Sequence, residues 1–236
     1  MTVRRVLITG ASKGIGKALA DKLADDGHEI IGVARTAPEN FTGEFLEVDL
    51  GDRAATAQAL STIVAQPVDA VINNVGLASV APIGSVDLDD LFHTYDMNVR
   101  TAVQVVQAAL PGMLAAGWGR IVNITSLVTL GMPERTAYGA AKAALEACTR
   151  TWAEELAPTG ITVNAVAPGP VETELYRQRS PQGSERESSM LQRIPVRRVG
   201  DPYEIAHTIS HLLDNEAGYL TGQIIRVDGG GSIGAS

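Results

Sequence analysis

Short runs of apolar, mostly β-branched residues alternate along this chain with longer segments in which apolar residues recur every three or four positions. The short runs predict strands at residues 6–8, 30–33, 45–48, 70–72, 121–124, 161–166 and 223–227. The longer segments predict helices at residues 15–26, 53–65, 97–116, 136–156 and 203–213. Strands that alternate with helices are joined by right-handed crossovers. We therefore predict an α/β fold, a doubly wound parallel sheet of about seven strands with helices on both faces.

Residues 176–200 depart from this alternation. The segment is polar, contains six arginines against two glutamates, and includes a serine-rich stretch from Ser184 to Ser189. Loops of this length inside compact domains are commonly lids or disordered segments. We expect residues 1–236 to form a single domain that carries a mobile substrate lid at about 176–200.

Composition and charge narrow the possible partners. The chain has 236 residues, of which 45% are hydrophobic, and its 19 basic and 27 acidic residues give a net charge of -8. A duplex-binding surface needs clustered positive charge, so we expect no nucleic-acid partner. The N-terminus lacks the apolar stretch of a signal peptide, and no apolar run is long enough to span a membrane. With a single cysteine, Cys148, the sequence fits a cytoplasmic protein.

A glycine-rich segment connects the first predicted strand to the first predicted helix. Glycines allow the backbone to approach a pyrophosphate closely, and the free N–H groups and dipole of a helix N-terminus favour its negative charge. A purely structural tight turn is the alternative. The segment predicts a dinucleotide phosphate site that comprises Gly10, Ser12, Lys13, Gly14, Ile15 and Gly16.

The same segment also matches the pattern Gly-x-Ser-x-Gly, in which Ser12 would be the nucleophile of a serine hydrolase on a strand-to-helix elbow. Lys13 and Gly16 have no function in such an elbow, and no downstream histidine has an obvious loop context. The hydrolase is therefore a remote alternative, and labelling of Ser12 by a fluorophosphonate would reveal it.

Tyr138 and Lys142 are four residues apart in a predicted helix and so lie on one face, one turn apart. An ammonium about 4 Å from a phenol contributes about 4 kcal/mol at an effective dielectric constant of about 20, before desolvation opposes it. We expect Lys142 to lower the pKa of Tyr138 toward the range in which a phenol exchanges protons near neutral pH. Chance produces such a pair fairly often, and an amphipathic helix with an exposed tyrosine is the alternative.

Taken in order, several motifs resemble those of the short-chain dehydrogenase/reductase family along the whole chain. They are residues 9–16, Asn73-Asn74-Val75-Gly76, Asn98, Ser126, Tyr138-x-x-x-Lys142, Pro168-Gly169, and residues 219–223 with Asp228-Gly229-Gly230. The resemblance implies a single Rossmann-type domain, and the carrier-linked 3-oxoacyl reductases are the members that the chain resembles most.

The resemblance also implies catalytic roles. Tyr138 would donate or accept the proton, and Lys142 would lower its pKa and bind the nicotinamide ribose. Ser126 would hold the substrate oxygen, and Asn98 would support a water relay to Lys142 from a helix irregularity. Ser126 lies 12 residues before Tyr138 where the family more often has 13, a spacing that Thr125 restores. We favour Ser126 because it ends the strand pattern as the family serine does.

The cofactor that the resemblance implies is NADP rather than NAD. In this family an aspartate at the end of the second strand selects NAD, whereas this chain has Arg35 there and a second cation, Lys13, in the glycine loop. An arginine fork suits a 2'-phosphate. The remaining expected cofactor contacts, at the adenine, the riboses and the nicotinamide, are Asp49, Leu50, Asn74, Gly76, Pro168, Gly169, Val171 and Thr173.

These expectations describe an NADP(H)-dependent oxidoreductase that transfers a hydride between NADPH and a ketone, 3-oxoacyl or secondary alcohol group, with a carrier-linked acyl group as one candidate substrate. A sugar or secondary-alcohol dehydrogenase is the alternative, and a non-catalytic cofactor-sensing protein is a remote one. The family implies a homotetramer or homodimer. His207 and His211 have metal-ligand spacing but no third ligand, so we expect no metal site.

Overall fold

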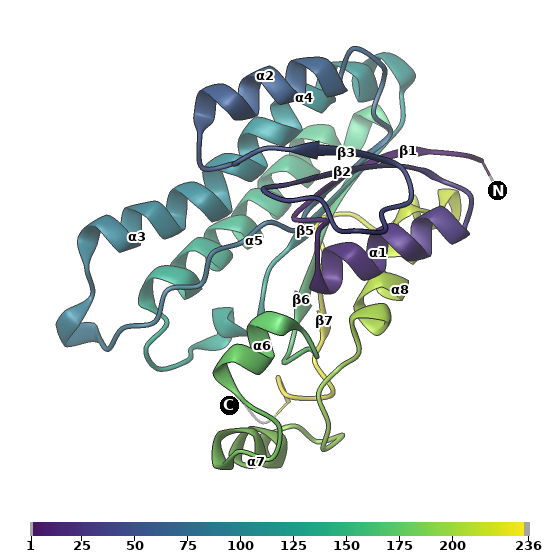
Figure 1. Cartoon of the computed structure of the whole chain (residues 1–236). Helices are drawn as coiled ribbons and strands as arrows, with labels where there is room; N and C mark the ends of the chain where they lie inside the picture. The colour runs from purple at the N-terminus through teal and green to yellow at the C-terminus, as the bar shows by residue number, and fades with distance from the viewer. Residues whose placement is uncertain (1, 234–236) are drawn as a thin grey trace.

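The centre of the molecule is a seven-stranded sheet in which every strand pair is parallel. The computed structural model describes residues 2–233. Its strand order is β3-β2-β1-β4-β5-β6-β7, which confirms the predicted doubly wound α/β fold (Figure 1). The strands are β1 (Arg5–Thr9), β2 (Glu29–Ala34), β3 (Glu44–Glu47), β4 (Ala70–Asn73), β5 (Gly119–Ile124), β6 (Ile161–Pro168) and β7 (Ile224–Val227). The order reverses between β1 and β4, so ligands are expected at the carboxyl ends of these two strands.

Helices cover both faces of the sheet (Figure 1). On one face, α1 (Gly14–Asp25) and α8 (Pro202–Leu213) bury Leu19 and Ile209 with strand residues such as Ile8. On the other face, α2 (Arg53–Ile63), α4 (Thr101–Ala116) and α5 (Thr136–Leu156) pack on residues such as Leu7 and Ile121. Successive strand residues thus enter opposite cores, which is why the strands are continuous apolar runs rather than alternating ones.

The predicted helix at 97–116 is one part of a longer helical segment. The segment consists of α3 (Leu88–Tyr95), a π-helical turn (Asp96–Arg100) and α4. The prediction omitted α3. Asp87 nevertheless supplies a helix start signal, since its carboxylate accepts a hydrogen bond from the Asp90 N–H at 3.0 Å. Leu88 and Phe92 of α3 are exposed. These two apolar side chains therefore lie on the face of α3 that points away from the core formed by residues 2–233.

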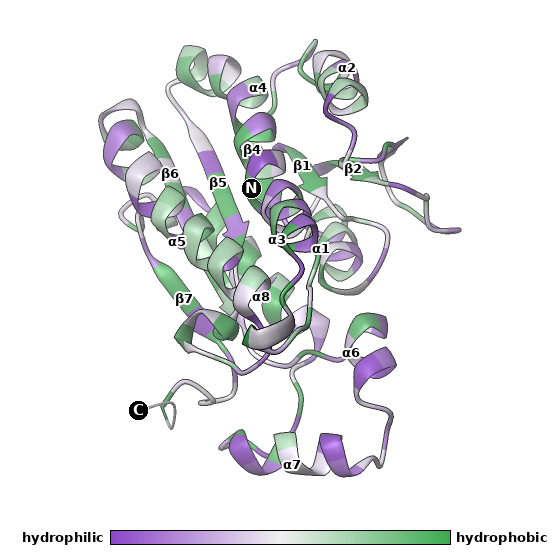
Figure 2. Cartoon of the chain, turned by 90° about the vertical axis from the view of Figure 1, so that its left-hand side faces the viewer, coloured by the Kyte–Doolittle hydropathy of each residue, from purple (hydrophilic) through white to green (hydrophobic). Residues whose placement is uncertain are grey.

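The polar segment 176–200 contains two short helices that the sequence did not predict. Thr173 caps α6 (Glu174–Arg179), and Ser184 caps α7 (Glu185–Arg193) by accepting a hydrogen bond from the Glu187 N–H at 3.2 Å. Both helices lie at one end of the molecule, away from the layers that cover the sheet, and α7 is largely hydrophilic (Figure 2). Arg177 forms salt bridges with Glu172 and Glu187, which tie α6 to α7.

No helix within residues 2–233 combines the length and the hydropathy that crossing a membrane requires.

Candidate active site

The glycine loop between β1 and α1 has a backbone that only glycine accommodates without strain. Gly10 and Gly14 have φ values of +67° and +55°, and a Cβ on Gly16 would lie 2.2 Å from the Gly10 carbonyl oxygen. Lys13 precedes α1 and provides no side-chain hydrogen bond to its first turn, so the N–H groups there are not capped by that side chain. A close backbone and an uncapped helix N-terminus fit the pyrophosphate of a dinucleotide.

Asn74 fastens this loop to β4. Its Nδ2 donates hydrogen bonds to the carbonyl oxygens of Thr9 at 3.1 Å and Gly10 at 3.0 Å. The Thr9 hydroxyl accepts from the backbone N–H groups of Asn74 and Val75, both at 3.1 Å. The side chain that the sequence assigned to cofactor binding thus positions the loop, at the point where the strand order reverses.

The residues predicted to bind the adenosine end lie beyond β2 and β3. Arg35 is exposed directly after Ala34, the last residue of β2. Asp49 is exposed and accepts a hydrogen bond from the Gly51 N–H at 2.9 Å. Leu50 is buried, and its carbonyl accepts from Arg100 Nη2 at 2.8 Å. The Nζ of Lys13 lies 3.3 Å from a carboxylate oxygen of Glu174.

Tyr138 lies in the first turn of α5, close to the carboxyl end of β5. Burial raises the pKa of Tyr138, and a hydrogen bond with the Ser126 hydroxyl opposes that rise. Thr125 is buried, and its hydroxyl contacts the Val166 carbonyl at 3.4 Å. Of the two candidate hydroxyls, the one on Ser126 therefore meets the phenol.

Lys142 follows one turn later on α5 and is only 2% exposed. Its Nζ donates to the Ile124 carbonyl at 2.8 Å and lies 5.7 Å from the centre of the Tyr138 ring. Burial lowers the pKa of Lys142 to about 7. We expected Lys142 to lower the pKa of Tyr138, but burial of the phenol raises this pKa, and the contributions that oppose the rise come from Ser126, Arg135 and Arg179.

Asn98 occupies the π-helical turn, which confirms the helix irregularity predicted there. Its Nδ2 donates to the carbonyls of Thr94 at 2.7 Å and Leu77 at 2.8 Å, while its buried Oδ1 has no partner within residues 2–233. A Cβ on Gly76 would lie 3.0 Å from this Oδ1 and 3.2 Å from Lys142 Nζ. Asn98 and Lys142 therefore converge on Gly76, and the unpaired carbonyl oxygen is available to a water molecule.

The segment after β6 forms the far wall of the site. A Cβ on Gly169 would lie 2.8 Å from the Cα of Asp228, so only glycine fits after Pro168. Val171 is buried and forms an isolated β-bridge with Gly200. The methyl group of Thr173 would lie 3.1 Å from a Cβ on Gly14. This wall therefore reaches the glycine loop, while the Thr173 hydroxyl itself caps α6.

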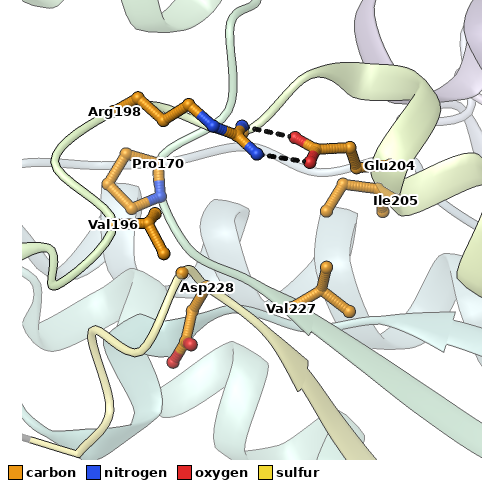
Figure 3. Close-up of a pocket in the computed structure, with 9 residues that line it drawn as sticks. Pro170, Val196, Arg198, Glu204, Ile205, Val227 and Asp228 are labelled. Carbon is orange, nitrogen blue, oxygen red and sulfur yellow. Dashed lines mark hydrogen bonds and ion pairs between the residues drawn. The ribbon is translucent and has the colours of Figure 1, made fainter.

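A pocket of about 100 Å³ opens beside this wall, between the end of the 176–200 segment and the start of α8 (Figure 3). Arg198 and Glu204 form a bidentate salt bridge at its edge, with both N–O distances at 2.7 Å. The residues of the glycine loop and Tyr138 do not line this pocket. His207 and His211 are exposed on α8, and no cluster of metal-binding side chains occurs within residues 2–233.

Although the run of arginines from Arg177 to Arg198 was a candidate for anionic-substrate recognition, two arginines near Tyr138 were not among the predicted catalytic or cofactor-binding residues, Arg135 just before α5 and Arg179 at the end of α6. Their positive charges act on the Tyr138 hydroxyl. The three-residue spacing between Arg135 and Tyr138 was the available sequence signal, whereas Arg179 comes from a segment whose path the sequence did not reveal.

Comparison with known proteins agrees with this geometry. Residues 10–232 match the family model described as enoyl-(acyl carrier protein) reductase. The chain is 36% identical over 239 residues to the 3-oxoacyl-[acyl-carrier-protein] reductase FabG of Pseudomonas aeruginosa, with 95% of each chain covered. It is 33% identical over 235 residues to FabG of Vibrio cholerae, with the same coverage. The chain belongs to the short-chain dehydrogenase/reductase family.

The solved structure of YwfH, an NADPH dependent reductase involved in bacilysin biosynthesis, superposes on this short-chain dehydrogenase/reductase with a TM-score of 0.89 at 27% identity, and 98% of each chain is covered. Membership of the family confirms the resemblance inferred from the ordered motifs. Family membership also argues against the alternative that Ser12 is the nucleophile of a serine hydrolase, because members of this family are oxidoreductases.

Proposed function

We propose that this chain is an NADPH-dependent ketoreductase that reduces 3-oxoacyl or related ketone groups to the secondary alcohol. The observation that carries the proposal is the position of Tyr138, where Ser126 and the carboxyl end of β5 lie beside the phenol and the buried Lys142 lies one helical turn away. The similarity to carrier-linked 3-oxoacyl reductases supports a 3-oxoacyl thioester as the substrate, with a carrier-linked acyl group as its natural form.

Bound NADPH would supply the hydride to the carbonyl carbon. The glycine loop would hold one end of this cofactor, and the wall after β6 would hold the other. Ser126 donates a hydrogen bond to the substrate oxygen, and Tyr138 transfers its hydroxyl proton to that oxygen as negative charge develops. A raised pKa keeps the Tyr138 proton in place until the oxygen becomes basic enough to take it. The product is the alcohol, and Tyr138 is left as the phenolate.

Lys142 and Asn98 return the proton to Tyr138 in this proposal. A pKa of about 7 allows Lys142 to release and accept a proton near neutral pH. The Asn98 carbonyl oxygen, which points at the same position as Lys142 Nζ, would hold the water molecule that connects the lysine to solvent. The π-helical turn is what allows a side chain within a helix to reach this point.

The reaction is tested by following NADPH absorbance with an acetoacetyl thioester, simple ketones and aldoses, and by repeating each assay with NADH. We expect consumption of NADPH with the thioester or the ketones. Oxidation of an aldose with NADP⁺, without reduction of any ketone, would instead favour a sugar dehydrogenase. No turnover with any of these compounds would contradict the proposed activity.

A preference for NADP(H) over NAD(H) is part of the proposal, and Arg35 and Lys13 are the cations that would bind the 2'-phosphate. Changing Arg35 to Ala should raise the Kd for NADPH about 10- to 100-fold, because a charge-assisted hydrogen bond is worth about 1.5–3 kcal/mol. Fluorescence titration measures both cofactors in the same variant, so NADH serves as the control. Equal weakening of NADPH and NADH would contradict a role for Arg35 in phosphate recognition.

Ser126 and Thr125 are distinguished by a matched pair of variants. Ser126→Ala should lower kcat about 100- to 1,000-fold, the usual effect of losing one hydrogen-bond donor to a developing oxyanion. Thr125→Val should leave kcat within about threefold and reduce only stability, since its hydroxyl faces β6. A larger loss of kcat in the Thr125 variant would show that Thr125, and not Ser126, contacts the substrate oxygen.

We further propose that residues 176–200 cover the substrate and that the chain assembles into a homotetramer or homodimer. The position of α6 supports the lid, because the Lys13–Glu174 salt bridge joins the first residue of α6 to the glycine loop. Assembly is supported by α3, where Leu88 and Phe92 are 66% and 68% exposed and lie one turn apart. Sedimentation analysis of the purified protein measures the number of subunits.

A further inference from the structure

Three arginines from three different segments lie close enough for their charges to act on one another, and two of them also act on Tyr138. Arg135 immediately precedes α5, Arg179 is the last residue of α6, and Arg186 lies in the first turn of α7. Two other arginines of the same region are paired, Arg177 with Glu172 and Glu187, and Arg198 with Glu204. Arg135, Arg179 and Arg186 form no salt bridge within residues 2–233.

Arg135 carries a buried donor that has no acceptor. Its Nη1 is inaccessible to solvent and forms no hydrogen bond within the described part of the chain. The residue is held in place by its backbone, because the Arg135 carbonyl accepts from the Gly139 N–H at 2.6 Å and the preceding Glu134 carbonyl accepts from the Ala81 N–H at 3.0 Å. A buried guanidinium donor without a partner costs free energy, and a bound anion is the group that would satisfy it.

Arg179 comes from the proposed lid. Its Nη2 donates to the Ala78 carbonyl at 2.9 Å, in the loop that follows β4 and includes Gly76. Ala81 of this loop also contacts Arg135 through an isolated β-bridge. Arg135 and Arg179 are thus anchored to the same short loop, and the other N–H groups of Arg179 are not engaged within residues 2–233.

The charges of these arginines act on one another and on the phenol. Burial lowers the pKa of the Arg135 guanidinium, and the positive charges of Arg179 and Arg186 lower it further. The charges of Arg135 and Arg179 also oppose the rise in the pKa of Tyr138. Mutual repulsion among like charges is relieved when an anion binds between them.

We propose that Arg135 and Arg179 bind a negatively charged group of the substrate itself, a carboxylate or a phosphate, close to the carbonyl that Tyr138 protonates. Arg135 is one helical turn from Tyr138, so the anion and the carbonyl belong to the same compact part of the substrate. This inference rests on the proposed reductase function. Among the ketones that such a reductase could take, it favours oxo acids and oxo phosphates over the neutral ketones and over the 3-oxoacyl thioester considered above.

Two pairs of compounds test the inference, and the members of each pair differ by one anionic group. Acetoacetate is compared with methyl acetoacetate, and dihydroxyacetone phosphate with dihydroxyacetone, by kcat/KM for NADPH oxidation. We expect the wild type to prefer the charged member of at least one pair by about tenfold or more, and the pair that shows the preference distinguishes a carboxylate from a phosphate. Arg135→Gln and Arg179→Gln should each reduce this preference about tenfold or more and leave the neutral member within about threefold.

Arg193→Gln is the matched control, because Arg193 is an exposed arginine in the last turn of α7 and should leave the preference unchanged. Equal rates for both members of both pairs, or a preference that persists in the Arg135→Gln, Arg179→Gln double variant, would overturn the inference. Turnover of neutral ketones without a charge preference overturns only this inference, whereas no turnover with any carbonyl compound overturns the proposed function.

A second measurement does not depend on turnover. Calorimetric titration of acetoacetate and of dihydroxyacetone phosphate into the NADP⁺-bound protein should show binding that weakens about tenfold or more in the Arg135→Gln variant. The NADPH Kd of that variant should stay within about twofold of the wild-type value. A loss of NADPH affinity would instead assign Arg135 to the cofactor, and the absence of binding by both anions would overturn the inference.

Discussion

Changing Tyr138 to Phe should lower kcat about 1,000-fold and leave the Kd for NADPH within about twofold. The substitution removes only the hydroxyl, and general acid catalysis by a positioned side chain contributes about 100- to 10,000-fold. The ring stays in the first turn of α5, so the shape of the site is retained. Stopped-flow measurement of NADPH oxidation gives the chemical step, and fluorescence titration gives the Kd.

Tyr203→Phe provides the matched control, since Tyr203 is exposed on α8 and should retain wild-type kinetics. The dependence of kcat on pH distinguishes the loss of the proton donor from a structural defect of the variant. If Tyr138→Phe keeps more than about one tenth of the wild-type kcat at neutral pH, another group must deliver the proton, and the proposed mechanism is wrong.

Changing Lys142 to Met should abolish most of the activity and, at the same time, stabilise the cofactor-free protein by about 1–4 kcal/mol at neutral pH. The gain follows from burial, because replacing a buried ionisable group by an apolar one of similar length removes its desolvation cost. Active sites commonly lower stability in this way. Urea unfolding measures the gain, and NADPH oxidation measures the loss, which we expect to be at least 100-fold.

The stabilisation should depend on pH in a defined direction. The folded pKa of Lys142 is about 7, below its ordinary value of 10.5, so the unfolded chain binds more protons between these values. The free energy of unfolding of the wild type therefore rises as pH increases from about 7 to about 10, and the destabilisation is complete below pH 7. The Lys142→Met variant lacks this slope, so its advantage is greatest at and below neutral pH.

Lys17→Met is the control for the loss of a lysine, because Lys17 lies at the surface in an i,i+4 pair with Asp21 and should change stability by less than about 0.5 kcal/mol. A Lys142→Met variant that is less stable than the wild type at every pH would show that the Lys142 ammonium supports the fold through its hydrogen bond to Ile124.

The sheet could be predicted from the sequence because strands that are buried on both faces consist of uninterrupted apolar residues. The segment 176–200 could not, since α6 and α7 are held by caps and by the Arg177 ion pairs instead of by an apolar stripe. Helix α3 was not predicted for a related reason, because Leu88 and Phe92 are exposed and its start signal lies in an acidic stretch. Elements stabilised by polar contacts or by surfaces outside the chain leave a weak periodic signal.

The site shows the same division. The glycine loop and the Tyr138–Lys142 spacing are local in sequence and could be recognised there, and the helix irregularity at Asn98 was implied by the family resemblance. The direction of the Tyr138 pKa shift was not predictable, because it depends on how deeply the folded chain buries the phenol. Arg179 meets Tyr138 only through the path of the lid, which spacing alone does not encode.

The π-helical turn at Asp96–Arg100 links the interior of the site to the outer surface of the molecule. A π turn holds one residue more than the α-helix that would replace it, and each residue of an α-helix advances by about 100°. Deleting one residue there would straighten the segment into a regular helix, withdraw Asn98 from Gly76, and rotate α3 so that Leu88 and Phe92 point elsewhere. Insertions and deletions in this turn are therefore constrained twice, once by proton transfer and once by the face that α3 presents to other molecules.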